Sequence, residues 1–527
     1  MKLDVLCSAV LLILLSGPTH CDGGNILVFP IEGSHWINME ILLRALHSKG
    51  HNITIIRSSQ SWYIKENSDY YKTITVPVEG ENNNQESITK MVNSVLEFER
   101  GALPLTTYLY IIGMFSTFID FHRNVCTYVS AILDNKELVS TMKASNFDVM
   151  LTDPTWGGGV ILAKYLNLPL VYNVRWIITG EAHFAIAPSP VSYIPITGTG
   201  LTDKMTFLQR VKNVILHIFT QTQNSLVVMQ TYQPLCEKYF GQSSNFNSFV
   251  LDADIWLMRV DFVFEFPRPT MPNVVYMGGF QCRPAKPLPP HLDDFVQSSG
   301  EHGVVLMSMG TFLNDLPHDM ADQIAAAFAK LPQKVIWKHK GYRPTTLGNN
   351  TLLVDWMPQN DILGHPKTRL FVAHGGTNGI QEAIYHGVPV VGIPGFFDQY
   401  DNLLRLKERG GARILTLSTV DEDNFLKAVQ EVLSDQSYRE NMQRLSRLHR
   451  DKPIHPLDNA IFWIEFVMRH KGADHLKSES YKMPWFYYYS VDVALLFIGI
   501  SALILTTTVL FIRCLFYRMF KNKSKQD

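Results

Sequence analysis

The stretch NILVFPIEGSHWINMEILLRALHSKGHNITII, residues 25–56, decides the fold of this chain. The apolar run at residues 25–30 is typical of a buried strand, and the apolar residues of 38–48 recur at the spacing of one helix face. Gly50 is the residue type expected just after a helix, and residues 52–56 form a second strand-like run. A strand, a helix and a strand in this order predict a βαβ unit and therefore a parallel α/β sheet.

The alternation of strands and helices begins again after a proline-rich segment. Residues 283–290 (RPAKPLPP) have the composition of an interdomain linker. Residues 304–309 then predict a strand, residues 320–330 a helix, and residues 421–470 helices without a further strand. Other strands are predicted at 147–151, 170–172, 335–337, 352–354, 370–373 and 389–393. Two doubly wound domains that face each other would leave a cleft at the carboxyl ends of their strands, where ligands bind.

The first residues of the chain have the pattern of a secretory signal peptide. Lys2 supplies a positive start, and the apolar run at residues 5–15 is too short to span a bilayer. We expect cleavage after Cys21, so that residues 1–21 are removed; an uncleaved anchor is the alternative.

A second apolar segment, residues 493–512, contains no charged residue. At about 1.5 Å per residue it spans roughly 30 Å, the thickness of the hydrocarbon core. Aromatic residues at 485–489 precede it and a basic tail at 513–527 follows it, which places the tail in the cytosol and the body in the lumen. Lys523 and Lys525 resemble the dilysine retrieval signal of endoplasmic-reticulum membrane proteins; ordinary positive-inside charge is the alternative.

Charge and cysteine usage argue against two classes of function. The formal net charge is −1, so no overall basic field indicates a nucleic-acid partner. Cys126, Cys236 and Cys282 are scattered and contain no C-x-x-C pair, so we expect neither a disulfide framework nor a metal site. The sequons at Asn52 and Asn349 predict glycosylation at exposed positions.

The densest candidate site lies between residues 356 and 399. The strand at 370–373 is followed by His374 and two glycines, and a helix begins near Asn378. Glycines before a helix N-terminus leave free N–H groups at a positive dipole end, which suits a diphosphate. Glu382 lies four residues after Asn378 on the same helical face, where a carboxylate can accept hydrogen bonds from ribose hydroxyls.

Other side chains of the second half have the chemistry of a nucleotide-sugar site. They are Trp356 for stacking on a base, Gln359 for hydrogen bonding nearby, Asp398 and Gln399 for sugar hydroxyls, and Ser308 and Thr311 for additional hydroxyl contacts.

Residues 355–402, DWMPQNDILGHPKTRLFVAHGGTNGIQEAIYHGVPVVGIPGFFDQYDN, resemble the donor-binding signature of the UDP-glycosyltransferases in their vertebrate UDP-glucuronosyltransferase form. The likeness covers nearly the whole chain and includes residues 33–36 and 254–259. It implies a GT-B fold with two facing Rossmann-like domains, inversion at the anomeric carbon, and neither a metal nor another cofactor. Two departures are Gly395, where the family often has leucine, and Gln381, where it often has tyrosine. We expect Gly395 to loosen the loop beside the sugar.

The resemblance also implies a role for each residue of the signature. Trp356 and Gln359 would face the uracil, His374, Gly376, Asn378 and Gly379 the diphosphate, Glu382 the ribose, Asp398 and Gln399 the sugar, and Arg259 a further part of the donor.

The catalytic base is expected in the first half of the chain. His35 lies at the carboxyl end of the first strand, and an imidazole can accept a proton from an attacking hydroxyl near neutral pH. A carboxylate on the other ring nitrogen would fix the tautomer and stabilise the imidazolium. The candidates are Asp153, at the end of the strand before Pro154, and Asp148, at its start; strand-end position and family resemblance favour Asp153.

These features together indicate a UDP-glucuronosyltransferase of the endoplasmic reticulum. It would transfer glucuronic acid from its co-substrate UDP-glucuronate to a hydroxyl of small lipophilic acceptors (xenobiotics, steroids or phenols) and form β-glucuronides. One alternative is the same chemistry with UDP-glucose, UDP-galactose or UDP-N-acetylglucosamine. A second alternative is a catalytically silent nucleotide-sugar-binding subunit. Assembly with itself or with related enzymes is left open.

The predicted organisation is a single-pass type I membrane protein. Its segments are a signal peptide (1–21), an N-terminal acceptor-binding domain with the base (22–282), a linker (283–290), a C-terminal UDP-sugar-binding domain (291–450), C-terminal helices with a juxtamembrane segment (451–490), a transmembrane helix (491–512) and a cytosolic tail (513–527).

Overall fold

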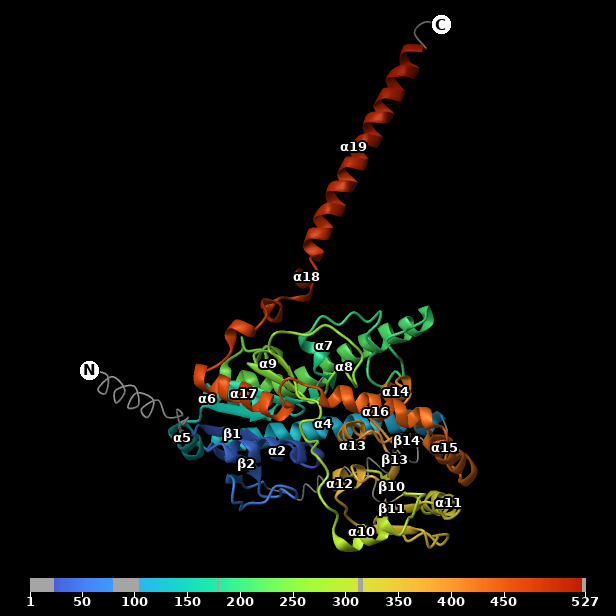
Figure 1. Cartoon of the computed structure of the whole chain (residues 1–527). Helices are drawn as coiled ribbons and strands as arrows, with labels where there is room; N and C mark the ends of the chain where they lie inside the picture. Colours follow the sequence, from blue (N-terminus) through green and yellow to red (C-terminus); the bar gives the residue numbers. More distant parts are fainter. Residues whose placement is uncertain (1–22, 79–103, 178–179, 311–315, 524–527) are drawn as a thin grey trace, which may run out of the picture. The chain divides into compact units, whose positions relative to one another are not determined.

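The structure is a computed structural model that describes residues 23–78, 104–177, 180–310 and 316–523. The chain up to Leu476 forms one compact unit, and the chain from Lys477 forms a second. The first unit contains two parallel sheets flanked by helices (Figure 1). The predicted signal peptide, Thr311 and Lys525 lie outside the described residues.

The sheet of the first half is parallel, with the strand order β3-β2-β1-β4-β5-β8-β9. Its strands are β1 (Asn25–Phe29), β2 (Asn52–Ser58), β3 (Lys72–Val76), β4 (Val149–Thr152), β5 (Leu170–Val174), β8 (Ile255–Met258) and β9 (Val274–Tyr276). A short antiparallel pair, β6 (Trp176–Ile177) and β7 (Gly180–Glu181), follows β5. The helices are α2 (Ser34–Ser48), α4 (Pro104–Asp134), α5 (Lys136–Ala144), α6 (Gly158–Leu166), α7 (His183–Ile186), α8 (Phe207–Phe240) and α9 (Phe246–Leu251).

The sheet of the second half is also parallel, with the strand order β12-β11-β10-β13-β14-β15. Its strands are β10 (Val304–Ser308), β11 (Lys334–Lys338), β12 (Thr351–Val354), β13 (Thr368–Ala373), β14 (Val390–Gly392) and β15 (Ala412–Ile414). The helices are α10 (Pro290–Gln297), α11 (His318–Ala329), α12 (Gln359–Leu363), α13 (Thr377–His386), α14 (Gln399–Glu408), α15 (Glu422–Ser434), α16 (Gln436–Arg450) and α17 (Pro456–His470), with 3₁₀ turns at η1 (Leu417–Thr419) and η2 (Asp474–Leu476).

The predicted βαβ opening is confirmed by the structure. Strands β1 and β2 pair in parallel from Asn25 opposite Asn52 onward, and α2 joins them. Gly33 has φ 71°, a conformation that glycine adopts without a Cβ clash, and it allows α2 to begin at the next residue, with four residues between the end of β1 and the helix. The helix therefore begins at Ser34 and not at Asn38, and His35, expected at the carboxyl end of the first strand, lies in the first turn of the helix.

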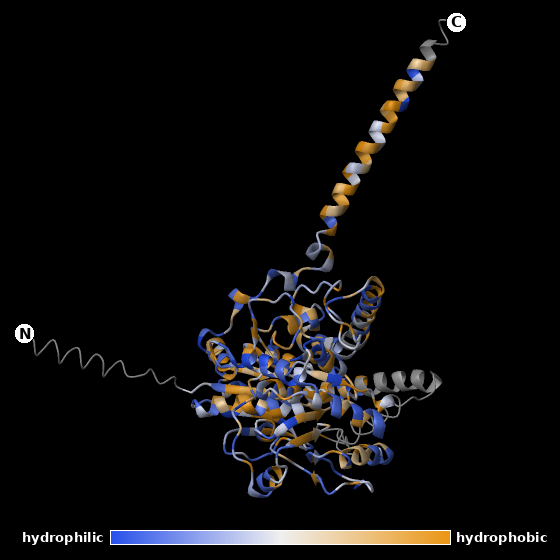
Figure 2. Cartoon of the chain, turned by 45° about the vertical axis from the view of Figure 1, so that its right-hand side comes forward, coloured by the Kyte–Doolittle hydropathy of each residue, from blue (hydrophilic) through white to orange (hydrophobic). Residues whose placement is uncertain are grey.

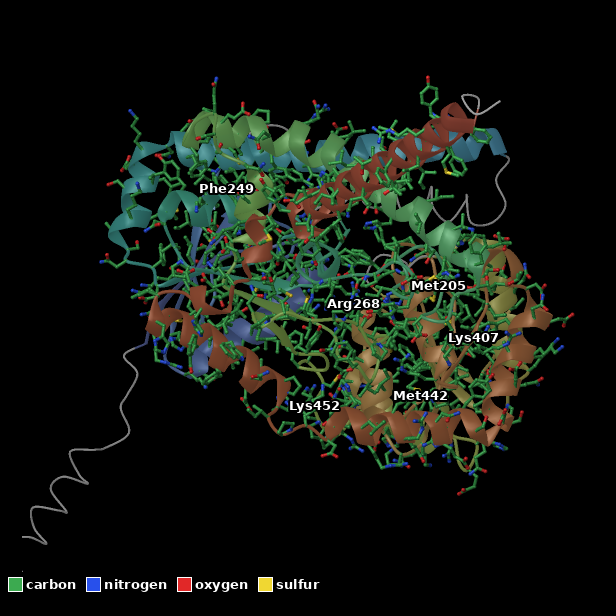
Figure 3. The ribbon with its side chains drawn as sticks, turned by 90° about the horizontal axis from the view of Figure 1, so that it is seen from above. Met205, Phe249, Arg268, Lys407, Met442 and Lys452 are labelled. Carbon is green, nitrogen blue, oxygen red and sulfur yellow. The ribbon has the colours of Figure 1, made fainter. Side chains whose placement is uncertain are left out.

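Helix α17 returns to the sheet of the first half. Its apolar side chains Ile461, Ile464 and Val467 lie in the same buried core as Ile26 of β1 and Leu42 of α2. In Figure 1 the orange α17 accordingly lies beside the blue and cyan elements of the first half. Lys452, labelled in Figure 3 together with Met442 of α16, lies in the loop between α16 and α17. The end of the second half is thus built into the first.

The second unit contains η3 (Glu479–Lys482), α18 (Trp485–Tyr488) and the long helix α19 (Val491–Lys523). The segment Val491–Phe520 of α19 contains an 18-residue stretch with a mean hydropathy of 2.5 and is long enough to cross a membrane. Figure 2 shows this helix mostly in the hydrophobic colours. The apolar helix predicted at residues 491–512 is therefore present, and it continues beyond the predicted end through Arg513 and Arg518.

Candidate active site

The side chain of His35 is paired with that of Asp153. The His35 Nδ1 atom lies 2.6 Å from Asp153 Oδ2. Asp153 directly follows β4, which pairs with β1 so that Thr152 lies opposite Phe29; the two carboxyl strand ends therefore bring the residues together. The carboxyl is buried, whereas 27% of the His35 side chain is exposed. Since Nδ1 faces the carboxylate, Nε2 is the nitrogen left to accept a proton from an acceptor hydroxyl.

Asp153 is held in its charged form. Burial raises the pKa of its carboxyl, but His35 and Arg259 and the hydrogen bond from the Thr155 backbone N–H outweigh burial, and the net pKa lies below the ordinary value. Thr155 donates from both its N–H (3.1 Å) and its hydroxyl (2.8 Å) to Oδ1. A charged carboxylate behind the imidazole is the arrangement that stabilises an imidazolium.

The alternative partner Asp148 lies at the other end of the same strand. Its Oδ2 accepts the Asn25 backbone N–H at 2.9 Å, and its Oδ1 lies 2.6 Å from Lys471 Nζ. Five residues of extended chain separate it from Asp153 by about 16 Å. The geometry therefore pairs His35 with Asp153, the first of the two candidates.

Arg259 lies at the end of β8 against this pair. Its Nη2 is 3.4 Å from Asp153 Oδ2 and 3.5 Å from His35 Nδ1. The guanidinium is buried, and its Nη1 has no hydrogen-bond partner within the part of the chain that the structure describes. A buried N–H group without a hydrogen-bond partner is costly. An anionic group of a bound UDP-sugar would accept a hydrogen bond from it.

The predicted diphosphate residues lie around the N-terminus of α13. Gly375 has φ 92°, and a Cβ there would lie 2.5 Å from the Gln399 carbonyl oxygen, so only glycine fits. Gly376 is the N-cap, and the Ile380 N–H is bonded to its carbonyl. The N–H groups of Thr377, Asn378 and Gly379 precede that bond and have no acceptor within the helix. Such an N-terminus attracts an anion.

His374 lies just before this glycine pair. Burial lowers the pKa of its imidazole to about 4, so the ring is neutral at physiological pH. It packs so closely against Gly310 that a Cβ on Gly310 would approach its Nε2 to 2.6 Å. Gly310 has φ 83° and follows Ser308, the last residue of β10. The structure therefore brings His374 and Ser308 to the same edge of the sheet, while Thr311 lies outside the described residues.

The residues predicted to contact the uracil and the ribose are Trp356, Gln359 and Glu382. The Gln359 Nε2 atom donates to Glu382 Oε2 at 2.6 Å. Burial raises the pKa of the Glu382 carboxyl to about 7, although the Gln359 hydrogen bond opposes this. Trp356, two residues after β12, exposes 72% of its surface, so its indole face is free for stacking.

Asp398 and Gln399 lie at the start of α14. Asp398 Oδ2 accepts hydrogen bonds from Arg175 Nε at 3.0 Å and Asn402 Nδ2 at 2.9 Å. Gln399 Oε1 accepts the backbone N–H of Gly395 at 2.8 Å. The loop that we expected Gly395 to loosen is thus held by a hydrogen bond from that residue's own backbone.

Two cations beside the site were not predicted from the sequence. Arg175, just after β5 in the first half, is buried and bonds Asp398, Glu265 Oε1 (2.8 Å) and Asn402 Oδ1 (3.0 Å). Lys338 is the last residue of β11 opposite Ser308, and its Nζ donates to the Gly310 carbonyl at 3.1 Å. Burial lowers the pKa of the Lys338 ammonium. Both residues could have been identified in the sequence, because each is a basic residue at the carboxyl end of a buried strand.

The prediction that no metal takes part stays a prediction. Among the described residues no group of histidine, cysteine and acidic side chains is arranged to hold a metal ion.

The family profile described as "UDP-glucoronosyl and UDP-glucosyl transferase" matches residues 24–526. The chain is similar to human UDP-glucuronosyltransferase 2A2, with 42% identity over 93% of this chain and 91% of that protein. It is also similar to rabbit (Oryctolagus cuniculus) UDP-glucuronosyltransferase 2C1, with 41% identity over 94% of this chain and 99% of that protein.

Solved structures with low sequence identity share the fold. The glycotransferase of kitacinnamycin aligns with a TM-score of 0.55 at 18% identity, over 84% of this chain and 98% of its own. The calicheamicin glycosyltransferase CalG4 aligns with a TM-score of 0.54 at 16% identity, over 85% of this chain and 99% of its own. The expected GT-B fold is confirmed. The family profile and these close relatives together show that the chain belongs to the UDP-glucuronosyl and UDP-glucosyl transferase family and is a UDP-glycosyltransferase.

Proposed function

We propose that the chain transfers glucuronic acid from UDP-glucuronate to a hydroxyl of small lipophilic acceptors, with inversion at the anomeric carbon. The observation that carries the proposal is the His35–Asp153 pair, with the buried Arg259 guanidinium 3.4 Å from the carboxylate. The names of the relatives, which are UDP-glucuronosyltransferases, support the choice of donor.

The proposed reaction is a single displacement. His35 Nε2 accepts the proton of the acceptor hydroxyl while that oxygen forms a bond to the anomeric carbon. The bond from the anomeric carbon to the diphosphate oxygen breaks at the same time, and UDP takes the electron pair. The negative charge on the leaving diphosphate is stabilised by the N–H groups and dipole at the N-terminus of α13. Attack from the face opposite UDP converts an α-linked donor into a β-glucuronide.

Arg259 can bind an anionic group of the sugar donor. A carboxylate in a buried site needs a cation or several hydrogen-bond donors. Arg175 is fully engaged by Asp398, Glu265 and Asn402, whereas Arg259 Nη1 is buried without a partner in the described chain. We therefore assign the uronate carboxylate, or the diphosphate of a neutral donor, to Arg259.

We place the protein in the endoplasmic-reticulum membrane, with its body in the lumen and the tail after α19 in the cytosol. The apolar helix α19 and the basic residues at its end support this orientation. The side chains of Asn52 and Asn349 are exposed, as glycosylation in the lumen requires.

The test is a donor-by-acceptor activity screen on membranes that contain the full chain. UDP-glucuronate, UDP-glucose, UDP-galactose and UDP-N-acetylglucosamine are compared at equal concentration with phenolic and steroidal acceptors. We expect UDP-glucuronate to be preferred and the product to be a β-glucuronide by NMR. Preference for a neutral donor, or an α-linked product, would contradict the proposal, and no transfer with any donor would favour a silent binding subunit.

The assignment of His35 as the catalytic base is tested with a matched pair of aspartate variants at the two ends of β4. Asp153→Asn removes the charge behind His35, whereas Asp148→Asn changes the same residue type at the distant end of β4. We expect Asp153→Asn and His35→Ala to lower kcat by about 10²–10⁴-fold, with UDP binding retained. Asp148→Asn is expected to keep most of the activity. The opposite order of the two aspartate variants would overturn the assignment.

A further inference from the structure

Gln381 joins the donor-binding helix to the catalytic half of the molecule. It lies on α13, three residues after Asn378, and only 1% of it is exposed. Its Nε2 donates to the Arg259 carbonyl at 2.8 Å. Its Oε1 accepts the Gly279 N–H at 3.0 Å and the Gln281 Nε2 at 2.9 Å. Every partner of this amide belongs to the first half of the chain.

The residue that Gln381 holds is the one that contacts the catalytic pair. The Arg259 N–H is bonded to the Val174 carbonyl of β5 at 3.1 Å, so its backbone is fixed from the first half on one side. Gln381 fixes the carbonyl on the other side. The guanidinium then lies within 3.5 Å of both Asp153 Oδ2 and His35 Nδ1. One side chain of α13 therefore connects this helix to the backbone of Arg259.

The turn that receives these hydrogen bonds is closely packed. Gly279 has φ 80°, and a Cβ at this position would lie 2.1 Å from His449 Nε2. A Cβ on Gly278 would lie 2.6 Å from the Val260 carbonyl carbon. Gly278 thus packs against the Val260 backbone and Gly279 against the His449 side chain, so the turn that bonds Gln381 is confined on two sides.

We propose that Gln381 is a positioning residue that couples the diphosphate end of α13 to the His35–Asp153 pair through Arg259. A donor bound at the N-terminus of α13 would then be in register with the base in the other half. The inference rests on the proposed function of these two sites but not on which sugar is transferred. It also gives a role to the departure from the tyrosine that the family often has at this position.

The test compares Gln381→Met with Gln281→Met in the full-length enzyme, using whichever donor wild type prefers. Gln381→Met keeps the length of the side chain but loses both polar atoms, so the Arg259 carbonyl and the Gly279 N–H lose their partner. Gln281→Met removes one contact of Gln381 and leaves its bond to Arg259. Steady-state kinetics, UDP affinity and the pH dependence of kcat are measured for both.

We expect Gln381→Met to lower kcat by about 10–100-fold, because transition-state alignment is lost, and to change UDP affinity by less than about threefold. The pH at which kcat falls to half should also shift, since the cation beside the base has moved. Gln281→Met should stay within about threefold of wild type in kcat and show no shift. Gln381→Glu keeps an acceptor for Gly279, and its ionised form places a second acceptor against the Arg259 carbonyl in place of the donor. The loss of kcat should therefore appear where the new carboxyl is ionised and diminish at lower pH, where its O–H can donate to Arg259 again.

Other outcomes overturn the inference. A normal kcat in Gln381→Met, or a loss shared equally by Gln281→Met, would show that the coupling does not exist. A parallel fall in UDP affinity and kcat without a pH shift would show a purely structural role. If Gln381→Met does not fold, Gln381→Glu decides the matter alone. Since every comparison is made relative to active wild type, failure here is separate from failure of the donor assignment.

Discussion

At the scale of single residues, Glu382 has the most distinctive electrostatics of the donor site. Its half-buried carboxyl receives one hydrogen bond, from Gln359, and burial raises its pKa to about 7. The neutral acid predominates below that pH and the carboxylate above it. Only the carboxylate can accept hydrogen bonds from two ribose hydroxyls with both of its oxygens.

Glu382 therefore predicts a pH-dependent affinity for the nucleoside part of the donor. Affinity for uridine, which carries no phosphate that titrates in this range, should rise by several-fold from pH 6 to pH 8. In Glu382→Gln the rise should disappear and affinity at pH 8 should fall. Calorimetry or tryptophan fluorescence at several pH values measures both. An unchanged slope in the variant would show that another group titrates.

At the scale of elements, a buried ion cluster ties the end of α16 to the segment after β8. Asp261 Oδ2 lies 2.7 Å from His449 Nδ1 and 2.6 Å from Lys452 Nζ, and Lys452 also donates to the Gly278 carbonyl at 2.8 Å. Burial alone would raise the pKa of the Asp261 carboxyl, but these two partners lower it to about 2. The cluster fixes the segment that continues from Arg259.

This depressed pKa predicts a pH-dependent contribution to folding stability. A carboxyl whose pKa is about 2 in the folded state and about 3.9 in the unfolded chain stabilises the fold by roughly 2.6 kcal/mol. That stability is fully present above about pH 4 and is lost as the pH falls toward 2.

In urea unfolding of the detergent-solubilised chain, Asp261→Asn should be less stable than wild type at pH 7. The difference should shrink as the pH is lowered from 5 to 3. Lys452→Met, which removes one of the two partners, should have a smaller effect at pH 7. A difference that is constant over the whole range would exclude Asp261 as its source.

At the scale of the whole molecule, the anchor and the exposed sequons predict a topology. Protease added to intact microsomes should remove only the residues after the α19 membrane span and leave the body intact. A glycosidase should then shift the protected band, and the double variant Asn52→Gln with Asn349→Gln should not shift. Digestion of the body with protection of the tail would reverse the proposed orientation.

The arrangement of the two halves also explains why one chain forms one compact unit up to Leu476. Helix α17 leaves the second half and packs into the core of the first, and Asp254 Oδ1 accepts the Ala473 N–H at 2.8 Å just after it. The ion bridge from Arg175 to Asp398 and the amide bonds of Gln381 cross between the halves at the site itself. The candidate site is therefore stabilised by the contacts that join the halves.

Local patterns in the sequence were sufficient to predict the central strands and helices and the apolar helix α19. The βαβ opening, the glycine turn before α13 and the apolar span of α19 follow from spacings that backbone geometry imposes on neighbouring residues. The same geometry placed His35 and Asp153 at adjacent strand ends. In the two large sheets, strands β3, β8, β9 and β15 lay outside the predicted strands. Strands β9 and β15 have three residues each, too few to show a period in the sequence.

The sequence by itself determined the βαβ opening, the apolar helix α19 and the residue types of the donor signature. Only the tertiary structure decided that Asp153 and not Asp148 meets His35, that Arg175 reaches Asp398, and that Gln381 holds Arg259. Partners in these pairs are separated by more than a hundred residues. A local pattern constrains only residues within a few turns or one strand, whereas such pairs depend on how two separately formed sheets pack together.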